Sequence, residues 1–401
     1  MVIDKIKKYH LCLGCGLCSS VLGHDKCKME LTKEGFFEPY LYGHVDDSVV
    51  KKICPGIKVH GNVKGELWGR FSQLLEGWAC DNEIRFHSSS GGVVSALAVF
   101  LIEEKIVDAV LQVGVSSDNY LKNELKVSKS REKIVGNAQS RYAPALTLFN
   151  IKQILEDGDE IYAFVGKGCD IAGVKNLLKQ YPQYRNRFKL FISIICAGMP
   201  SQKGTEKAWG LSGKIVEPVA VKYRGDGWPG YFEAFWDDGS IFKLSYHESW
   251  GKVLSGLLNF RCKVCADGIG TLADISVGDS WCTKDGYPDF EEQEGKCLVF
   301  IRTKQGSEVI SAAKLKGYIN IHPIDESSLS QIQPGQYQRR KYAGWRLFPV
   351  QIASCFFLDF HNLGIIKQAF SANYVTGIKN MTGTLRRMMK LNSYCFRRFC
   401  K

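Results

Sequence analysis

The sequence predicts a mixed α+β and α/β fold with a small cysteine-rich module, an α/β domain with a β-rich portion, and a helical, basic C-terminus. Three observations lead to this prediction. Closely spaced cysteines stand near the N-terminus, strand-like and helix-like apolar runs then alternate, and the chain from about 340 is aromatic and then basic. We therefore divide the chain into 1–66, 67–335 and 336–401.

The N-terminal cysteines have the spacing of an iron–sulfur ligand set. The segment LCLGCGLCSS is a C-x2-C-x2-C run, and a Cys-Pro pair follows much later. In bacterial-type ferredoxins such a run supplies three thiolates to one 4Fe–4S cluster, and a distant Cys-Pro supplies the fourth. The sequence therefore predicts a ferredoxin-like module with one 4Fe–4S cluster, whose ligands are Cys12, Cys15, Cys18 and Cys54.

Two alternatives remain open for this module. Cys27 is the competing fourth ligand, although no proline follows it. A zinc site is the other alternative, but zinc sites usually pair one C-x2-C with a second pair. We expect no second cluster within the module, because Leu22 and Gly23 stand where a further Cys-Pro would follow the run.

Apolar runs of strand length and helix length alternate through the middle of the chain. Strand, helix and strand at these lengths predict βαβ units with at least partly parallel pairing. The segment GGVVSALAVFLIEE is apolar nearly all round, which predicts a buried helix. The expected helices cover Gly91–Glu104, Leu146–Glu156 and Asp170–Tyr181, and the expected strands cover Asp108–Val115, Glu160–Val165 and Phe188–Ile195.

Beyond about 215 the pattern becomes β-rich. Asp238-Gly239 between YFEAFW and IFKLSY predicts a hairpin, and ADISVG and CLVFIRT predict further strands. The stretch Leu347–Ile366 is apolar but contains a proline and a charge, which are costly inside a membrane span. We therefore expect a buried or interfacial helix there and no transmembrane helix.

A second group of cysteines falls next to the predicted strands. Cys262 and Cys265 form a C-x2-C pair, Cys169 follows the strand EIYAFV, and Cys196 follows FKLFISII. If those two strands are neighbours, the thiols of Cys169 and Cys196 emerge at one sheet edge. The four cysteines are then candidate ligands of a second cluster. The alternative is that Cys169 and Cys196 are small buried apolar residues.

Three polar turns are candidate contacts for a nucleotide or flavin. HSSSGG precedes the buried helix, where exposed N–H groups and the helix dipole favour phosphate, and an ordinary serine cap is the alternative. GKGCD is a second strand–turn–helix, without a full G-x-G-x-x-G, and NAQSRY is a polar loop before a helix. No acid or base is assigned. The candidate cofactor-binding residues are Ser89, Ser90, Gly91, Gly92, Ser140, Arg141, Tyr142, Gly166, Lys167, Gly168 and Asp170.

Charge and cysteine content bear on the compartment and the partners. The fifteen cysteines follow a charged N-terminus without a secretory pattern, so we expect a reducing, cytoplasmic setting in which thiols serve metals. The formal net charge is +12, and no acidic residue follows Asp359. This basic tail suits an anionic lipid surface, an acidic protein or plain solvent. Nucleic acid is disfavoured, because no recognisable nucleic-acid-binding motif accompanies the tail.

Together the motifs resemble the coenzyme F420 hydrogenase/dehydrogenase beta-subunit family. The matching stretches run in the expected order from about 10 to 300, and the last hundred residues are not covered. One turn departs from the family pattern, because Lys167-Gly168-Cys169-Asp170 stands where Thr-Pro-Cys-Gln is common. The stretches are CLGCGLC, CPG, SSSGGVVSAL, AQSRYAPAL, FVGKGCDIAGVKNLL, IICAGMPS, YRGDGWPG and RCKVCADGIGTLADISVGDSW.

The resemblance implies an iron–sulfur flavoprotein oxidoreductase with FAD in the α/β domain. It also implies hydride exchange with an organic substrate such as coenzyme F420, with ferredoxin or another electron-transfer protein as partner. It strengthens the assignment of a second 4Fe–4S cluster. The alternatives are a ferredoxin-dependent reductase acting on a sugar or nucleotide sugar in bacterial polysaccharide biosynthesis, a non-catalytic electron-transfer subunit, and a zinc-stabilised binding protein.

Overall fold

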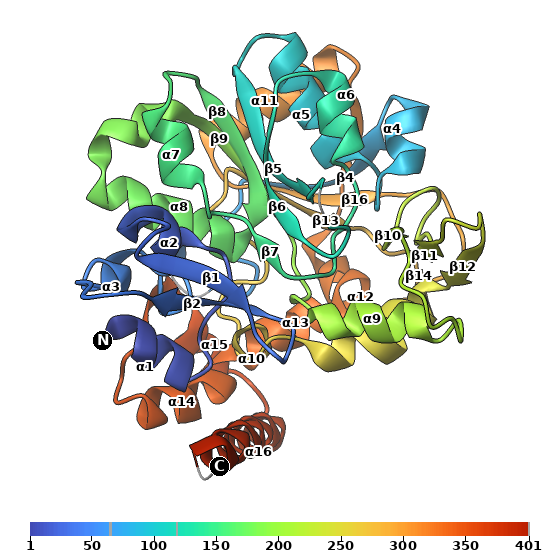
Figure 1. Cartoon of the computed structure of the whole chain (residues 1–401). Coiled ribbons are helices and arrows are strands. Elements are labelled where there is room, and N and C mark those ends of the chain that lie inside the picture. The colour runs from blue at the N-terminus through green and yellow to red at the C-terminus, as the bar shows by residue number, and fades with distance from the viewer. Residues whose placement is uncertain (64–65, 118, 400–401) are drawn as a thin grey trace.

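A nine-stranded mixed sheet forms the centre of the protein (Figure 1). The computed structural model describes residues 1–63, 66–117 and 119–399. The sheet order is β17-β4-β16-β13-β9-β8-β5-β6-β7, with parallel pairing from β13 through β9 and β8 to β5. The strands are β4 (Gln73–Ala79), β5 (Ala109–Val115), β6 (Asn123–Ser128), β7 (Ala145–Leu146), β8 (Tyr162–Lys167), β9 (Phe188–Ile194), β13 (Ile275–Asp279), β16 (Cys297–Ile301) and β17 (Ile319–Pro323).

Helices cover both faces of this sheet. α5 (Val93–Glu103) and α11 (Lys304–Leu315) pack on one face, where α5 buries an almost continuous run of Val, Ala, Leu and Phe. α7 (Ile151–Glu156) and α8 (Gly168–Gln180) pack on the other face. The unit β8–α8–β9 is a predicted βαβ crossover, so the expected mixed α/β fold with parallel pairing is confirmed.

The N-terminal module packs against α8 and against the C-terminal segment. Leu17 and Ile53 enter the core around α8, and Ile3 and Ile6 share a second core with Leu347. The module contains short helices as well as strands, namely α1 (Val2–Lys8), α2 (Leu17–Leu22), β1 (Cys27–Leu31), β2 (Phe37–Leu41), α3 (Val50–Ile53) and β3 (Lys58–Val63).

The β-rich portion forms a separate three-stranded antiparallel sheet, which contains the predicted hairpin. Phe235 pairs with Ile241 across the Asp238-Gly239 turn. The neighbouring helix α9 (Gln202–Gly210) contributes Ala208 and Trp209 to the same small core. The elements are β10 (Ala220–Lys222), β11 (Phe232–Phe235), β12 (Ile241–Leu244) and a two-residue pair, β14 (Thr283–Lys284) with β15 (Tyr287–Pro288).

Two expected helices are shorter than the sequence suggested. Residues 145–146 form strand β7 beside β6, and the following helix, α7, starts only at Ile151. The apolar stretch near 350 is helical only to Ala353, because Cys355 and Phe356 take left-handed backbone angles that end the helix. It continues as β18 (Asp359–Leu363), which pairs in parallel with β3.

The C-terminal segment is helical apart from β18. Among the described residues, no helix has both the length and the apolar character needed to cross a membrane. Figure 1 shows the last helices together at one end of the molecule, beside α1. The remaining helices are α4 (Asn82–His87), α6 (Arg131–Gly136), α10 (Phe260–Lys263), α12 (Leu329–Ile332), α13 (Pro334–Lys341), α14 (Ala343–Ala353), α15 (Ile365–Phe370) and α16 (Tyr374–Phe399).

Candidate functional site

A cavity of about 280 Å³ opens beside the carboxyl ends of the central parallel strands. The ends of β8, β9 and β13 contribute to its wall, together with the turn before α5 and the loop before β7. Ligands of open α/β sheets bind at this edge. Nine of the eleven predicted cofactor-binding residues line the cavity, namely Ser89, Ser90, Gly92, Ser140, Arg141, Tyr142, Gly166, Lys167 and Asp170.

The turn before α5 presents hydroxyls and backbone amides to this cavity. Gly92 has a φ of +77°, which lets the chain turn sharply into the helix, and no side chain caps that helix. The Ser140 amide donates to Ser89 Oγ at 2.6 Å, which ties the turn to the opposite wall. Gly91 does not line the cavity, because it packs against the Lys296–Cys297 backbone, where an added Cβ would lie 2.9 Å from the Cys297 nitrogen.

Lys167 and Asp170 form a buried ion pair at the start of α8. Lys167 Nζ lies 2.7 Å from Asp170 Oδ2, and Thr147 Oγ1 donates to Asp170 Oδ1 at 2.7 Å. Burial would lower the pKa of the Lys167 ammonium, but the Asp170 carboxylate raises it above the ordinary value. Lys167 therefore supplies a permanent positive charge to the cavity wall. Gly168 faces a neighbouring cavity with Cys169.

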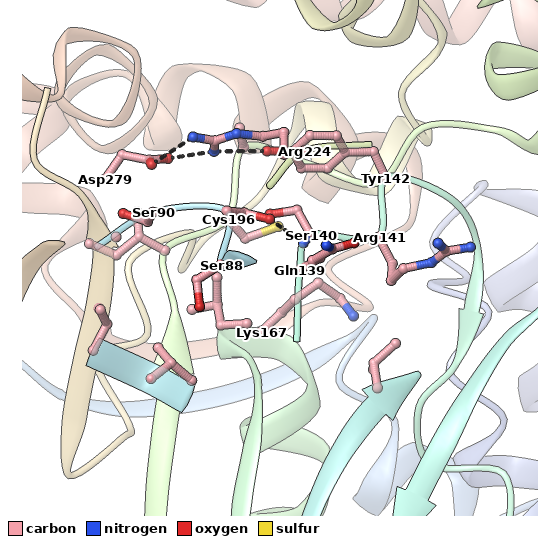
Figure 2. Close-up of a pocket in the computed structure, with 18 of the residues that line it drawn as sticks. Ser88, Ser90, Gln139, Ser140, Arg141, Tyr142, Lys167, Cys196, Arg224 and Asp279 are labelled. Carbon is pink, nitrogen blue, oxygen red and sulfur yellow. Dashed lines mark hydrogen bonds and ion pairs between the residues drawn. The ribbon is translucent and has the colours of Figure 1, made fainter. Parts of the chain in front are cut away.

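Arg141 and Tyr142 have different roles in the wall. The Arg141 guanidinium donates to Asn123 Oδ1, Val221 O and Tyr120 O at 2.7 to 2.9 Å, so these interactions hold it within the protein. Its side chain points away from the cavity centre in Figure 2. The Tyr142 hydroxyl instead accepts a hydrogen bond from Arg224 Nη1 at 3.3 Å.

Arg224 and Asp279 close one end of the cavity (Figure 2). Arg224 is almost fully buried and forms an ion pair with the Asp279 carboxylate. Trp228 Nε1 donates a hydrogen bond to this carboxylate at 2.9 Å. Burial would lower the pKa of Arg224, but Asp279 raises it well above the usual value. The rings of Tyr246 and Trp281 lie 5.0 and 5.4 Å from the guanidinium carbon. This end is therefore aromatic and permanently charged.

The sequence did not identify several residues of the wall. Tyr246, Trp250 and Gln336 come from distant loops and helices, and no local motif marks them. Gln336 Nε2 donates to Cys196 O at 2.9 Å, while its buried Oε1 has no hydrogen-bond partner among the described residues. Such an unpaired acceptor on a cavity wall suits a ligand that donates a hydrogen bond.

The four cysteines of the second predicted set, Cys169, Cys196, Cys262 and Cys265, line one small cavity. Cys196 lies on the walls of both cavities and therefore joins them. The Gly198 amide donates to Cys196 Sγ at 3.3 Å. Burial raises the pKa of the Cys262 thiol to about 12 and that of Cys169 well above its usual value. Four half-buried thiols on one cavity, two of them with backbone amide donors, suit an iron–sulfur cluster.

The N-terminal set also comes together. Burial is the main cause that raises the pKa of the Cys12 and Cys15 thiols. The nearby Cys54 raises both pKa values further, and Cys15 also raises that of Cys12. The pKa of the Cys18 thiol is raised first by its hydrogen bond with Cys27, then by burial, and further by Cys12 and Cys15. Cys27 contacts Cys18 from β1. This arrangement favours Cys54 over Cys27 as the fourth ligand, because Cys54 interacts with two members of the run.

The spacing of the sulfur atoms can be compared with the spacing of thiolates around a single zinc ion. Four thiolates around one zinc ion lie about 3.8 Å apart, because the Zn–S bond is about 2.3 Å and the geometry tetrahedral. Within the described part of the chain, no three sulfurs of either set lie within 4.8 Å of one another. The only trio of His, Cys, Asp or Glu ligand atoms there that meets this limit is His60, Asp359 and His361.

Comparison with known proteins identifies the family. Residues 74–152 match the family model "Coenzyme F420 hydrogenase/dehydrogenase, beta subunit N-term", and residues 159–327 match the corresponding C-terminal model. The chain belongs to this beta-subunit family. The resemblance of its motifs is thereby confirmed, and both matches lie in the α/β part that carries the cavity.

Relatives within the beta-subunit family are oxidoreductases or their subunits, which supports an oxidoreductase role. The coenzyme F420 hydrogenase subunit beta of Methanothermobacter thermautotrophicus is 23% identical over 67% of this chain and 88% of its own length. The coenzyme F420-dependent sulfite reductase of Methanocaldococcus jannaschii is 26% identical over 81% of this chain and 49% of its length. The rice chloroplast 7-hydroxymethyl chlorophyll a reductase is 21% identical over 80% and 64%.

A solved structure shares the fold of this protein. A chain of the F420-reducing [NiFe] hydrogenase complex from Methanosarcina barkeri superposes with a TM-score of 0.53 at 22% identity. The match covers 70% of this chain and 94% of that chain. At this identity the likeness concerns the fold alone.

Proposed function

We propose that this protein is an iron–sulfur flavoprotein oxidoreductase that passes electrons between two 4Fe–4S clusters and FAD. The observation that carries the proposal is the spatial order of three sites: the N-terminal cysteine set, the second cysteine set and the larger cavity. Leu13 lies in the N-terminal cysteine run and also on the wall of the second cysteine cavity, and Cys196 joins that cavity to the larger one. The second cysteine set therefore stands between the first set and the cavity.

FAD fits the larger cavity through its phosphate and ring environments. Ser89, Ser90 and the free amides at the start of α5 would hold the pyrophosphate, and Lys167 would add positive charge beside it. When bound, FAD supplies two-electron hydride chemistry and the clusters supply one-electron transfer. The apolar walls of the cavity would exclude water from the flavin ring.

The other end of the cavity suits an organic hydride donor or acceptor. Tyr246 and Trp281 provide flat apolar surfaces, and Arg224 remains protonated beside them. Coenzyme F420 is the substrate we propose first, because F420-dependent enzymes recur among the relatives. A ferredoxin or a partner subunit would exchange electrons with the Cys12 set. Relatives that are subunits of larger enzymes also favour the second candidate, a non-catalytic electron-transfer subunit.

Anaerobic purification with analysis of iron, acid-labile sulfide and released flavin tests the cofactors. We expect about eight irons and one FAD per chain, which is the content of two 4Fe–4S clusters and one flavin site. Zinc without iron or flavin would overturn the proposal. Prereduced protein is then mixed with coenzyme F420. Rapid reduction of coenzyme F420 supports the enzyme hypothesis. If the protein holds all its cofactors and exchanges electrons with a ferredoxin but does not reduce coenzyme F420, the result supports the electron-transfer subunit.

A further inference from the structure

Large apolar side chains are exposed together on the C-terminal segment. Phe356, Ile366 and Phe370 are exposed to 73%, 73% and 72%. Phe348 and Ile352 of α14 are each more than half exposed. Single exposed apolar residues are common on protein surfaces, but a group of this size on neighbouring elements marks an interaction site.

Helix α16 extends this surface with an amphipathic pattern. Val375, Ile378 and Leu385 recur at intervals of three and seven residues, so they lie on one side of the helix, and all three are exposed. Another side of the helix packs inward, where Trp345 of α14 closely approaches Gly377. The exposed apolar stripe of α16 is therefore additional to its packing face.

Basic residues border the apolar stripe. Lys379 and Arg386 each follow a stripe residue by one position and so lie along its edge, and Lys390 continues the row. All three are exposed. The sequence contains no acidic residue after Asp359 to offset them. Lys367 adds a further exposed positive charge between Ile366 and Phe370.

We propose that the surface formed by α14, α15 and α16 docks the protein on an anionic lipid bilayer, with α16 lying parallel to the membrane. Interfacial helices combine an apolar side with a Lys- and Arg-rich border in this way. The exposed phenylalanines suit the boundary between headgroups and acyl chains. A second copy of the chain is disfavoured, because it would bring two rows of positive charge together.

Vesicle flotation of the full-length holoprotein tests the docking. We compare vesicles of phosphatidylcholine alone with vesicles that also contain phosphatidylglycerol. Binding is expected only to the anionic vesicles and should weaken as salt is raised, because ions screen the basic border. The triple variant Lys379→Gln, Arg386→Gln and Lys390→Gln should lower the partition coefficient roughly a hundredfold, since each charge near the surface contributes about 1 kcal/mol.

Matched variants separate the surface from general changes of charge or apolarity. Lys33→Gln, Lys133→Gln and Lys304→Gln remove the same charge from exposed positions elsewhere and should leave binding within about twofold. Ile366→Ser with Phe370→Ser should weaken binding, whereas Ile215→Ser with Val216→Ser, which changes another exposed apolar pair, should not. Iron and flavin content, measured on each variant, reports that the fold is retained.

Three outcomes would overturn the proposal. The first is equal binding to neutral and anionic vesicles, or none to either. The second is equal loss of binding in the control variants. The third is evidence that the surface serves a protein partner. Such evidence would be a dimer in light scattering that Ile378→Ser dissociates, or saturable binding of an acidic ferredoxin that removes the protein from vesicles. None of these measurements depends on electron transfer.

Discussion

Arg224 and Asp279 form a two-pronged ion pair inside the protein, with Nη1–Oδ2 and Nη2–Oδ1 distances of 2.9 and 3.0 Å. Arg224 stands in the glycine-rich loop before β11, and Asp279 ends β13. The pair therefore fixes that loop to the end of a central sheet strand. It also keeps a charged group at the proposed substrate end of the cavity.

Removing one partner of this pair should strongly destabilise the protein. Asp279→Ala leaves a buried guanidinium without its carboxylate, which costs about 3–5 kcal/mol in the free energy of unfolding. The double variant Arg224→Met with Asp279→Ala should recover part of this loss, because no unpaired charge remains. Chemical denaturation of the single and double variants measures the coupling. Equal stability of Asp279→Ala and the unchanged protein would contradict the ion pair.

Cys54 and Cys27 should differ in their effect on iron content. Cys54→Ser removes a proposed ligand of the N-terminal cluster, so we expect loss of about half of the iron, which is one of the two proposed clusters. Cys27→Ser should retain it, because Cys27 is buried on β1 beside Cys18. Iron analysis and low-temperature electron paramagnetic resonance check both variants. The reverse outcome would make Cys27 the fourth ligand.

Cys196 should be needed for electron flow between the first cluster and the flavin. Cys196→Ala is expected to lose the second cluster while keeping the N-terminal one, and flavin reduction by a prereduced donor should slow by orders of magnitude. Cys297 offers a control, since it also lines the large cavity but belongs to neither set. Cys297→Ala should keep both clusters. Stopped-flow absorbance of the flavin distinguishes the two variants.

Gly92 should be required for flavin binding. Gly92→Ala places a Cβ 3.1 Å from the Ile84 carbonyl oxygen at a φ of +77°, so the turn carrying Ser89 and Ser90 must shift. Gly43 has a similar φ of +73°, but an added Cβ there meets no atom within 4 Å. Both variants should lose about 1–2 kcal/mol of stability from the left-handed backbone. Only Gly92→Ala should release flavin, and fluorescence titration with FAD measures the difference.

Local sequence patterns predict the parts of this protein that depend on local interactions. The parallel arrangement of β8 and β9 follows from two apolar runs joined by α8, and the hairpin at Asp238-Gly239 follows from its turn residues. The same strand ends bring Cys169 and Cys196 to one cavity, as expected from their positions. Such features need only the period of the side chains and the residues of the turn.

Contacts between distant segments were not predictable from the sequence. β18, which starts at Asp359, pairs with β3, a segment about 300 residues earlier in the sequence. No residue pattern near Asp359 indicates this distant partner. Tyr246 and Gln336 likewise reach the cavity from loops and helices without a recognisable motif. Their positions depend on how the elements pack, and the pattern within each element does not contain that information.

The pairing of β3 with β18 makes the proposed N-terminal cluster module depend on a segment synthesised much later. His60 and Asp359 are 299 residues apart in sequence, yet they share a 2.7 Å hydrogen bond across this pair. A nascent chain in which residues 359–363 have not yet been synthesised has no partner for β3. The proposed iron ligands would therefore stay on an unfinished scaffold until residues 359–363 have been synthesised, so chains terminated before Asp359 should emerge without a stable metal centre.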